Sequence, residues 1–181
     1  MKKILVFTCL GLGLSAQAAG AVGIGLEAFG GVSYPVVQDD REQGGMWGIR
    51  APVNLVPLIA LEPYYSSASY GDKTLDTIAG SQTLQGGEVY SWGLNVILTS
   101  GTPLFRIFPY LGIGSSKDDH PPTGEVTKTA YNLGLGVGFG LPVVKLGVNV
   151  RAEGQMIVNG DTSRKFGNLT AGLSYTFLSL P

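Results

Sequence analysis

Residues 143–158 read VVKLGVNVRAEGQMIV, and apolar and polar side chains alternate along nearly the whole stretch. Successive side chains of a β-strand point to opposite faces, so this period of two predicts a strand with one apolar and one polar face. The apolar face carries Val144, Leu146, Val148, Val150, Ala152, Met156 and Val158, and the polar face carries Lys145, Asn149, Arg151, Glu153 and Gln155.

The preceding segment, residues 131–141, repeats the alternation, but glycines occupy most of its second face. The same test along the chain predicts eight strands, and no segment shows the 3.6-residue apolar period of an amphipathic helix. The predicted strands cover residues 21–33, 45–54, 58–68, 88–98, 103–115, 128–141, 143–158 and 167–178.

The predicted connections alternate in length. They are long at residues 34–44, 69–87, 116–127 and 159–166, and short at residues 55–57, 99–102 and 141–143. Long external loops and short periplasmic turns are typical of outer-membrane barrels, and an even strand number puts both termini on one side. We therefore predict an all-β fold, an eight-stranded antiparallel up-and-down transmembrane β-barrel.

The two faces of these strands differ in what they could contact. A face of glycine and charged residues suits neither lipid nor a well-solvated surface, so we predict that the apolar face points outward and the other lines the lumen. Opposite charges are closely balanced there, which predicts an ion-pair network that fills the lumen, or alternatively a polar gate for small solutes. The lumen residues are Glu27, Arg50, Glu62, Asn95, Arg106, Lys145, Asn149, Arg151, Glu153 and Gln155.

Aromatic residues gather at both ends of the predicted strands, as expected for rings at two membrane interfaces. The loop-side belt contains Trp47, Tyr65, Tyr90, Trp92 and Tyr131, and the turn-side belt contains Phe105, Phe139 and Phe177.

The first 18 residues are typical of a secretory signal. Lys2 and Lys3 precede an apolar run at residues 4–14 and the small-x-small site at residues 16–18, so the barrel domain would span residues 19–181. The sole cysteine, Cys9, lies in that signal. The chain has 12 basic and 13 acidic residues, and removal of two lysines gives 10 − 13 = −3, which argues against a nucleic-acid partner.

The last predicted strand contains TAGLSYTF at residues 170–177, in which Thr170, Gly172, Tyr175 and Phe177 match a polar-x-Gly-x-x-aromatic-x-aromatic pattern. With FPYLGIG at residues 108–114 and the glycine alternation of residues 133–140, the mature chain resembles the small outer-membrane β-barrel family that includes OmpX and the OmpA transmembrane domain. The resemblance implies outer-membrane lipid and the barrel-assembly machinery, which would read the last strand, as partners. Residues 178–181 depart from the pattern, which usually ends on the aromatic residue.

The sequence predicts no catalytic, cofactor or metal site. Asp118, Asp119 and His120 are adjacent, but Pro121 and Pro122 disfavour the turn that a metal site would need, and His120 is the sole histidine. We expect a non-enzymatic outer-membrane barrel, either structural or presenting loops whose ligands the sequence does not specify. The alternatives are a narrow channel, a lipid-modifying enzyme and a lipocalin-like soluble barrel.

Overall fold

The computed structural model describes residues 22–36, 41–56, 58–77, 80–102, 104–120, 124–159 and 162–180. The predicted signal segment lies outside these residues. No helix among them is long and apolar enough to cross a membrane.

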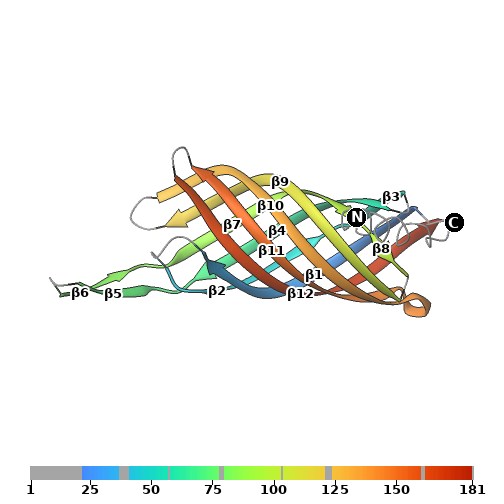
Figure 1. Ribbon diagram of the computed structural model, residues 1–181, viewed down its shortest axis with the longest axis horizontal. Coiled ribbons are helices and arrows are strands. Elements are labelled where there is room, and N and C mark those ends of the chain that lie inside the picture. Colours follow the sequence, from blue (N-terminus) through green and yellow to red (C-terminus); the bar gives the residue numbers. More distant parts are fainter. Residues whose placement is uncertain are drawn as a thin grey trace, which may run out of the picture.

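The described chain forms a closed antiparallel barrel of eight strand positions (Figure 1). Each strand pairs with the next along the chain, and the first pairs with the last, which closes the sheet. The eight positions are β1 (Val22–Pro35), β2 (Gly44–Arg50) with β3 (Val53–Val56), β4 (Ile59–Tyr70), β7 (Gly87–Leu98) with β8 (Ser100–Gly101), β9 (Phe105–His120), β10 (Gly124–Leu141), β11 (Leu146–Asn159) and β12 (Thr162–Leu180). The predicted fold class is therefore confirmed.

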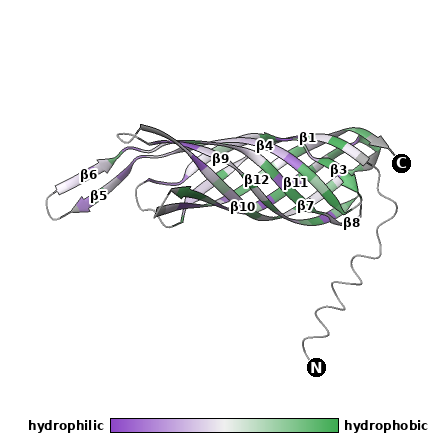
Figure 2. Cartoon of the chain, turned by 90° about the horizontal axis from the view of Figure 1, so that it is seen from above, coloured by the Kyte–Doolittle hydropathy of each residue, from purple (hydrophilic) through white to green (hydrophobic). Residues whose placement is uncertain are grey.

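The barrel has two distinct ends. The start of β1, the end of β12 and the short 3-10 turn η1 (Pro142–Val144) lie at what we name the turn end. A separate hairpin of β5 (Lys73–Thr77) and β6 (Gly80–Leu84) projects far beyond the opposite end, the loop end (Figure 1). Hydrophobic segments cover the barrel wall toward the turn end, whereas the projecting hairpin is mostly hydrophilic (Figure 2).

Two of the predicted long loops are wrong. Most of residues 116–127 and 159–166 continues the ladder, because β9 pairs with β10 up to His120 and Gly124, and β11 pairs with β12 up to Asn159 and Thr162. These extensions lack the outward apolar face on which the prediction rested. Backbone pairing does not need that face, so the strands run on past it.

Polarity is inverted at the loop end. Over most of the wall the exposed side chains are apolar and the inward ones polar, as predicted, but near the loop end polar residues lie outside and apolar ones inside. A barrel wall surrounded by water has this second arrangement. The exposed and buried neighbours are Ser69 and Tyr70 on β4, Glu88 and Val89 on β7, Thr129 and Ala130 on β10, and Lys165 and Phe166 on β12.

Two prolines of the wall lie where a neighbouring ladder is already interrupted. Pro109 of β9 falls between the β9 residues that pair with β7 and those that pair with β8. Pro63 of β4 falls between the segments that pair with β2 and with β3, and its carbonyl accepts a hydrogen bond from the Ala51 amide at 2.9 Å. Proline lacks an amide hydrogen, so a break in the ladder lowers the cost of placing it there.

Candidate functional site

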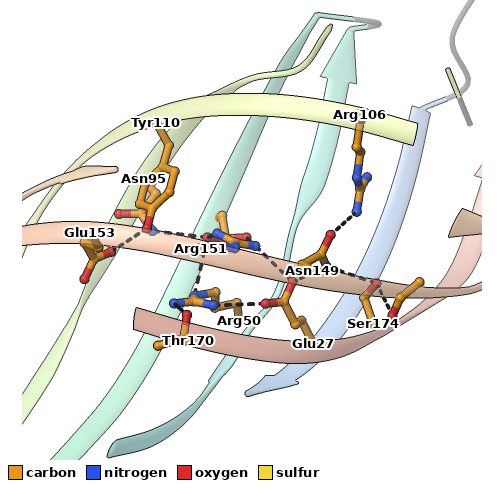
Figure 3. A network of polar contacts seen from close by, with 12 residues as sticks. Glu27, Arg50, Asn95, Arg106, Tyr110, Asn149, Arg151, Glu153, Thr170 and Ser174 are labelled. Carbon is orange, nitrogen blue, oxygen red and sulfur yellow. Dashed lines mark hydrogen bonds and ion pairs between the residues drawn. The ribbon is translucent and has the colours of Figure 1, made fainter. Parts of the chain in front are cut away.

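Four buried charged side chains form the centre of the lumen, which we name the ion cluster: Glu27, Arg50, Glu62 and Arg151. Figure 3 labels Glu27, Arg50 and Arg151 of this cluster. Arg50 Nη1 lies 2.9 Å from Glu27 Oε1, and Arg151 Nη2 lies 2.9 Å from Glu27 Oε2. Arg151 also donates to both carboxylate oxygens of Glu62, at 2.7 and 2.8 Å. All four residues are at most 4% exposed, so each carboxylate is neutralised by arginine in a site shielded from solvent.

The register explains how four separate strands supply this cluster. Glu27 of β1 lies directly opposite Arg50 of β2. Glu62 comes from β4, and Arg151 reaches it from β11 on another part of the wall. The small diameter of an eight-stranded barrel lets one long side chain span the lumen.

Aromatic rings support both arginines of the cluster. The guanidinium carbon of Arg50 lies 3.6 Å from the ring centroid of Phe29, and that of Arg151 lies 4.9 Å from that of Phe108. These rings in turn occupy space that glycine leaves open. A Cβ on Gly48 would meet the Phe29 ring at 2.4 Å, and one on Gly136 would meet the Phe108 ring at 2.2 Å.

Neutral side chains satisfy the remaining acceptors of the ion cluster. Asn149 donates to Glu27 Oε2 at 2.7 Å, and Asn95 donates to Glu62 Oε1 at 3.1 Å. Every carboxylate oxygen of the cluster therefore has at least one donor, as buried charges require.

Above the ion cluster, toward the loop end, lies a third carboxylate with only neutral hydrogen-bond partners among the described residues. Glu153 accepts from the Tyr110 hydroxyl and from the Asn168 amide, both at 3.0 Å. Beyond it, a cluster of apolar side chains shares the lumen with hydrogen-bonded neutral polar groups, such as Ser91 with Ser116 and Gln155. This apolar cluster contains Phe29, Met46, Ala68, Tyr70, Val89, Ala130, Ile157 and Phe166.

The loop end of the lumen is covered by a charged group that the sequence analysis did not identify. Asp118 of β9 lies 3.2 Å from Arg41 and 2.9 Å from Arg164, and Arg41 also stacks on the Tyr70 ring. Asp118 thus pairs with two arginines, and the part of the chain that the structure describes contains no group of three acidic, His or Cys side chains placed to hold a metal ion. The side chain of His120 lies outside that part.

Below the ion cluster, Arg106 of β9 lines a cavity at the turn end. Figure 3 shows Arg106 beside Asn149. The cavity contains about 300 Å³ not filled by protein atoms, part of it open to solvent. Arg106 donates to Asn149 Oδ1 at 3.1 Å. Pro52, Asn54, Ala60, Ile97 and Thr99 also line this space, together with Glu27, Glu62, Phe108 and Arg151.

Lys145 does not line the lumen, contrary to the prediction. It follows η1 with a φ of 57°, and its side chain is exposed. The tight turn takes this residue out of the regular alternation of β11, which begins only at Leu146. A period of two therefore assigns the wrong face to Lys145, which precedes the first residue of β11.

The residues assigned to the two belts all lie on the outer wall. Trp47 and Tyr65 make an edge-on contact with centroids 6.2 Å apart toward the loop end, and Phe105 and Phe139 make a tilted one at 5.3 Å toward the turn end. Tyr90, Trp92 and Tyr131 complete the first group and are half-buried or exposed.

β12 pairs with the whole of β1, from Phe166 to Leu180, and so closes the barrel. Thr170 points inward and accepts from Arg50 at 3.4 Å, whereas Tyr175 and Phe177 are exposed with ring centroids 5.2 Å apart. The register shifts by one residue at Phe177, after which residues 178–180 still pair with β1. A bulge at the terminal aromatic thus accommodates the residues that depart from the family pattern.

No protein-family model matches the sequence, and no curated protein sequence matches it. Solved structures do match. The N-terminal β-barrel domain of OprF from Pseudomonas aeruginosa superposes with a TM-score of 0.61 at 18% identity, over 87% of this chain and 99% of that one. Neisserial surface protein A gives 0.60 at 15% identity over 88% and 99%, and Ail, the attachment invasion locus protein of Yersinia pestis, gives 0.52 at 13% over 88% and 100%. This chain therefore has the fold of the small eight-stranded outer-membrane β-barrels.

Proposed function

We propose that this protein is a non-enzymatic outer-membrane barrel that is closed to solutes and acts through the face presented at its loop end. The observation that carries the proposal is the filling of the lumen by two successive layers. The ion cluster seals the middle with side chains at most 4% exposed, and above it the apolar cluster and buried, mutually hydrogen-bonded side chains such as Ser91 and Ser116 fill the lumen.

The outer wall supports the membrane location. Large apolar side chains are exposed over the zone between the two groups of aromatic residues, and the closed ladder leaves no strand edge for lipid to contact. In this location the turn end faces the periplasm and the loop end faces outward. Export through the predicted signal segment, and insertion by the assembly machinery through Thr170, Gly172, Tyr175 and Phe177, belong to the same proposal.

The β5–β6 hairpin is the element best placed to contact the surroundings. Its two strands pair only with each other among the described residues, and it extends the molecule well beyond the wall (Figure 1). One structural neighbour carries attachment in its name. For this chain we propose surface contact through the hairpin, with a ligand still to be identified.

Cysteine labelling on intact cells tests this orientation, since the predicted mature chain has no cysteine. We expect Gln82→Cys, in the hairpin, to react with a membrane-impermeant maleimide. The matched variant Lys145→Cys, exposed at the turn end, should react only after the outer membrane is disrupted. Labelling of Lys145→Cys in intact cells, or extraction of the protein by salt without detergent, would contradict the proposal.

Bilayer conductance separates the closed barrel from the narrow channel, which is the second candidate because of the cavity at the turn end. Refolded protein, shown to be folded by its gel shift on boiling, should give silent planar bilayers. Reproducible current steps that scale with salt concentration would establish the channel instead. Unchanged lipid composition in a deletion strain would agree with the absence of a lipid-modifying activity.

A further inference from the structure

We infer that the turn-end cavity binds a small anion such as chloride, held by the guanidinium of Arg106. The inference goes beyond the closed-barrel proposal and does not depend on it, because the cavity lies below the ion cluster and is open to solvent on its own side.

The first argument is the charge balance of the lumen. Two carboxylates and two arginines make up the ion cluster, and their mutual contacts at 2.7–2.9 Å leave it without net charge. Apart from the loop-end group of Asp118, Arg41 and Arg164, two inward charges remain among the described residues, Arg106 below the cluster and Glu153 above it. Arg106 contacts Asn149 of β11, and Glu153 lies four residues further along the same strand. Four residues of strand span roughly 13 Å, so the two charges are well separated. The ion cluster lies between them, so they do not pair.

The second argument is the set of contacts that Arg106 makes. The described residues provide one hydrogen bond, from Nη2 to the neutral amide oxygen of Asn149, and one contact with the Phe108 ring at 5.5 Å between the guanidinium carbon and the centroid. No carboxylate of the described residues forms an ion pair with it. An arginine has five N–H donors, so this side chain keeps donor capacity beside an open space.

The two nearby carboxylates do not supply the missing partner. Glu27 and Glu62 also line the cavity, but their oxygens already accept from Arg50, Arg151, Asn95 and Asn149. Thr99 and Asn54 add neutral polar residues to the lining of the cavity. A partly buried cation with spare donors and no bound carboxylate is stabilised by an anion from solution.

The size of the site limits the ligand. Arg106 lies against β10, where a Cβ on Gly138 would come within 2.7 Å of Nε, so the wall side of the guanidinium is covered. The space that the centre of a water-sized sphere can reach is only about 20 Å³, which is enough for about one such sphere. This favours a single small ion over a lipid headgroup or a peptide.

A chloride titration of the refolded, isotope-labelled protein tests the inference by NMR. The reporters are the Gly138 amide and the Asn149 side-chain amide, which both adjoin Arg106. We expect saturable shifts with a Kd on the order of 10 mM, as befits one ion pair at a partly open site. Arg106→Gln should weaken binding at least tenfold, whereas Arg106→Lys, which keeps the charge, should retain saturable shifts.

The matched control is Lys145→Gln, which removes the same charge at the same end of the barrel but outside the lumen. Its titration should resemble that of the unmodified protein. Bromide-soaked crystals give an independent readout, with an anomalous peak expected beside Arg106. Shifts that rise linearly without saturation, or that saturate equally in Arg106→Gln, would overturn the inference.

Discussion

At the scale of single residues, Arg151 connects both carboxylates of the ion cluster with the aromatic rings of the lumen. It contacts both carboxylates of the ion cluster, and its guanidinium also lies over the rings of Phe108 and Tyr110. Removal of one member of a buried ion group leaves its partners charged and unpaired. The cost exceeds that of losing a contact on the surface.

We expect Arg151→Met to destabilise the folded barrel by about 3–5 kcal/mol, because Glu62 would keep only Arg50 at 3.9 Å and Glu27 would keep one arginine of two. Denaturant-induced unfolding in detergent or lipid vesicles measures the change. Arg164→Met is the matched control, since Arg164 pairs with Asp118 at the loop end, where its side chain is 23% exposed. That control should cost less than about 1 kcal/mol. Equal effects of the two variants would contradict a special role for the ion cluster.

Single residues also show what the alternation of apolar and polar side chains does not determine. Alternation brought Glu27, Arg50, Glu62 and Arg151 to the inner face, and the structure joins these four in one cluster. The sequence alone could not assign their partners, since partner choice depends on the stagger of neighbouring strands. It also misplaced Lys145, because a tight turn interrupts the period there.

At the scale of elements, the inward face of β10 consists largely of glycine, and the packing of the neighbouring strand β9 explains why. Tyr110, Phe108 and Arg106 of β9 lie directly opposite Gly134, Gly136 and Gly138 of β10. Each large inward side chain lies over the glycine across from it, where a Cβ would come within 2.2–2.7 Å of it. Glycine thus lets a narrow barrel hold large side chains, an arrangement known from aromatic–glycine pairs in sheets.

Gly136→Ala should therefore destabilise the barrel by about 1–3 kcal/mol, because the added methyl group would displace the Phe108 ring from Arg151. Gly154→Ala on the adjacent strand β11 is the control. Its Cβ would have Leu133 O at 3.8 Å as its nearest neighbour, on the outer wall. Unfolding midpoints of the two variants give the comparison, and a neutral Gly136→Ala would show that the ring packing is loose.

At the scale of the whole molecule, the inversion of polarity divides the barrel into two zones. In one zone apolar residues face outward and the ion cluster lies inside, and in the other polar residues face outward around the apolar cluster. The change occurs near Trp47, Trp92 and Tyr131. Aromatic rings favour the interface between lipid and water, so their position agrees with a membrane boundary at this level.

Two arginine substitutions on the same face of β10 test this boundary. Leu135→Arg, in the apolar zone, should reduce folding stability in bilayers by about 2–4 kcal/mol, as measured for arginine near the midplane of such barrels. Thr129→Arg, six residues away in the polar zone, should change stability little. Unfolding of both variants in lipid vesicles provides the measurement. A harmless Leu135→Arg would mean that this wall does not contact hydrocarbon.

The sequence by itself determined the strand class, the number of strands, the direction of the apolar face in the membrane zone and the pairing of the last strand with the first. These follow from alternation and from the need to close a sheet in lipid, both of which are local or topological constraints. Only the tertiary structure decided the contacts within the ion cluster, the extension of β9 to β12 into the predicted loops, the inverted zone, and the position of Arg106 beside an open cavity. Those features depend on the register between neighbouring strands and on whether lipid or water surrounds each level of the wall. The alternation of apolar and polar residues along one strand specifies neither.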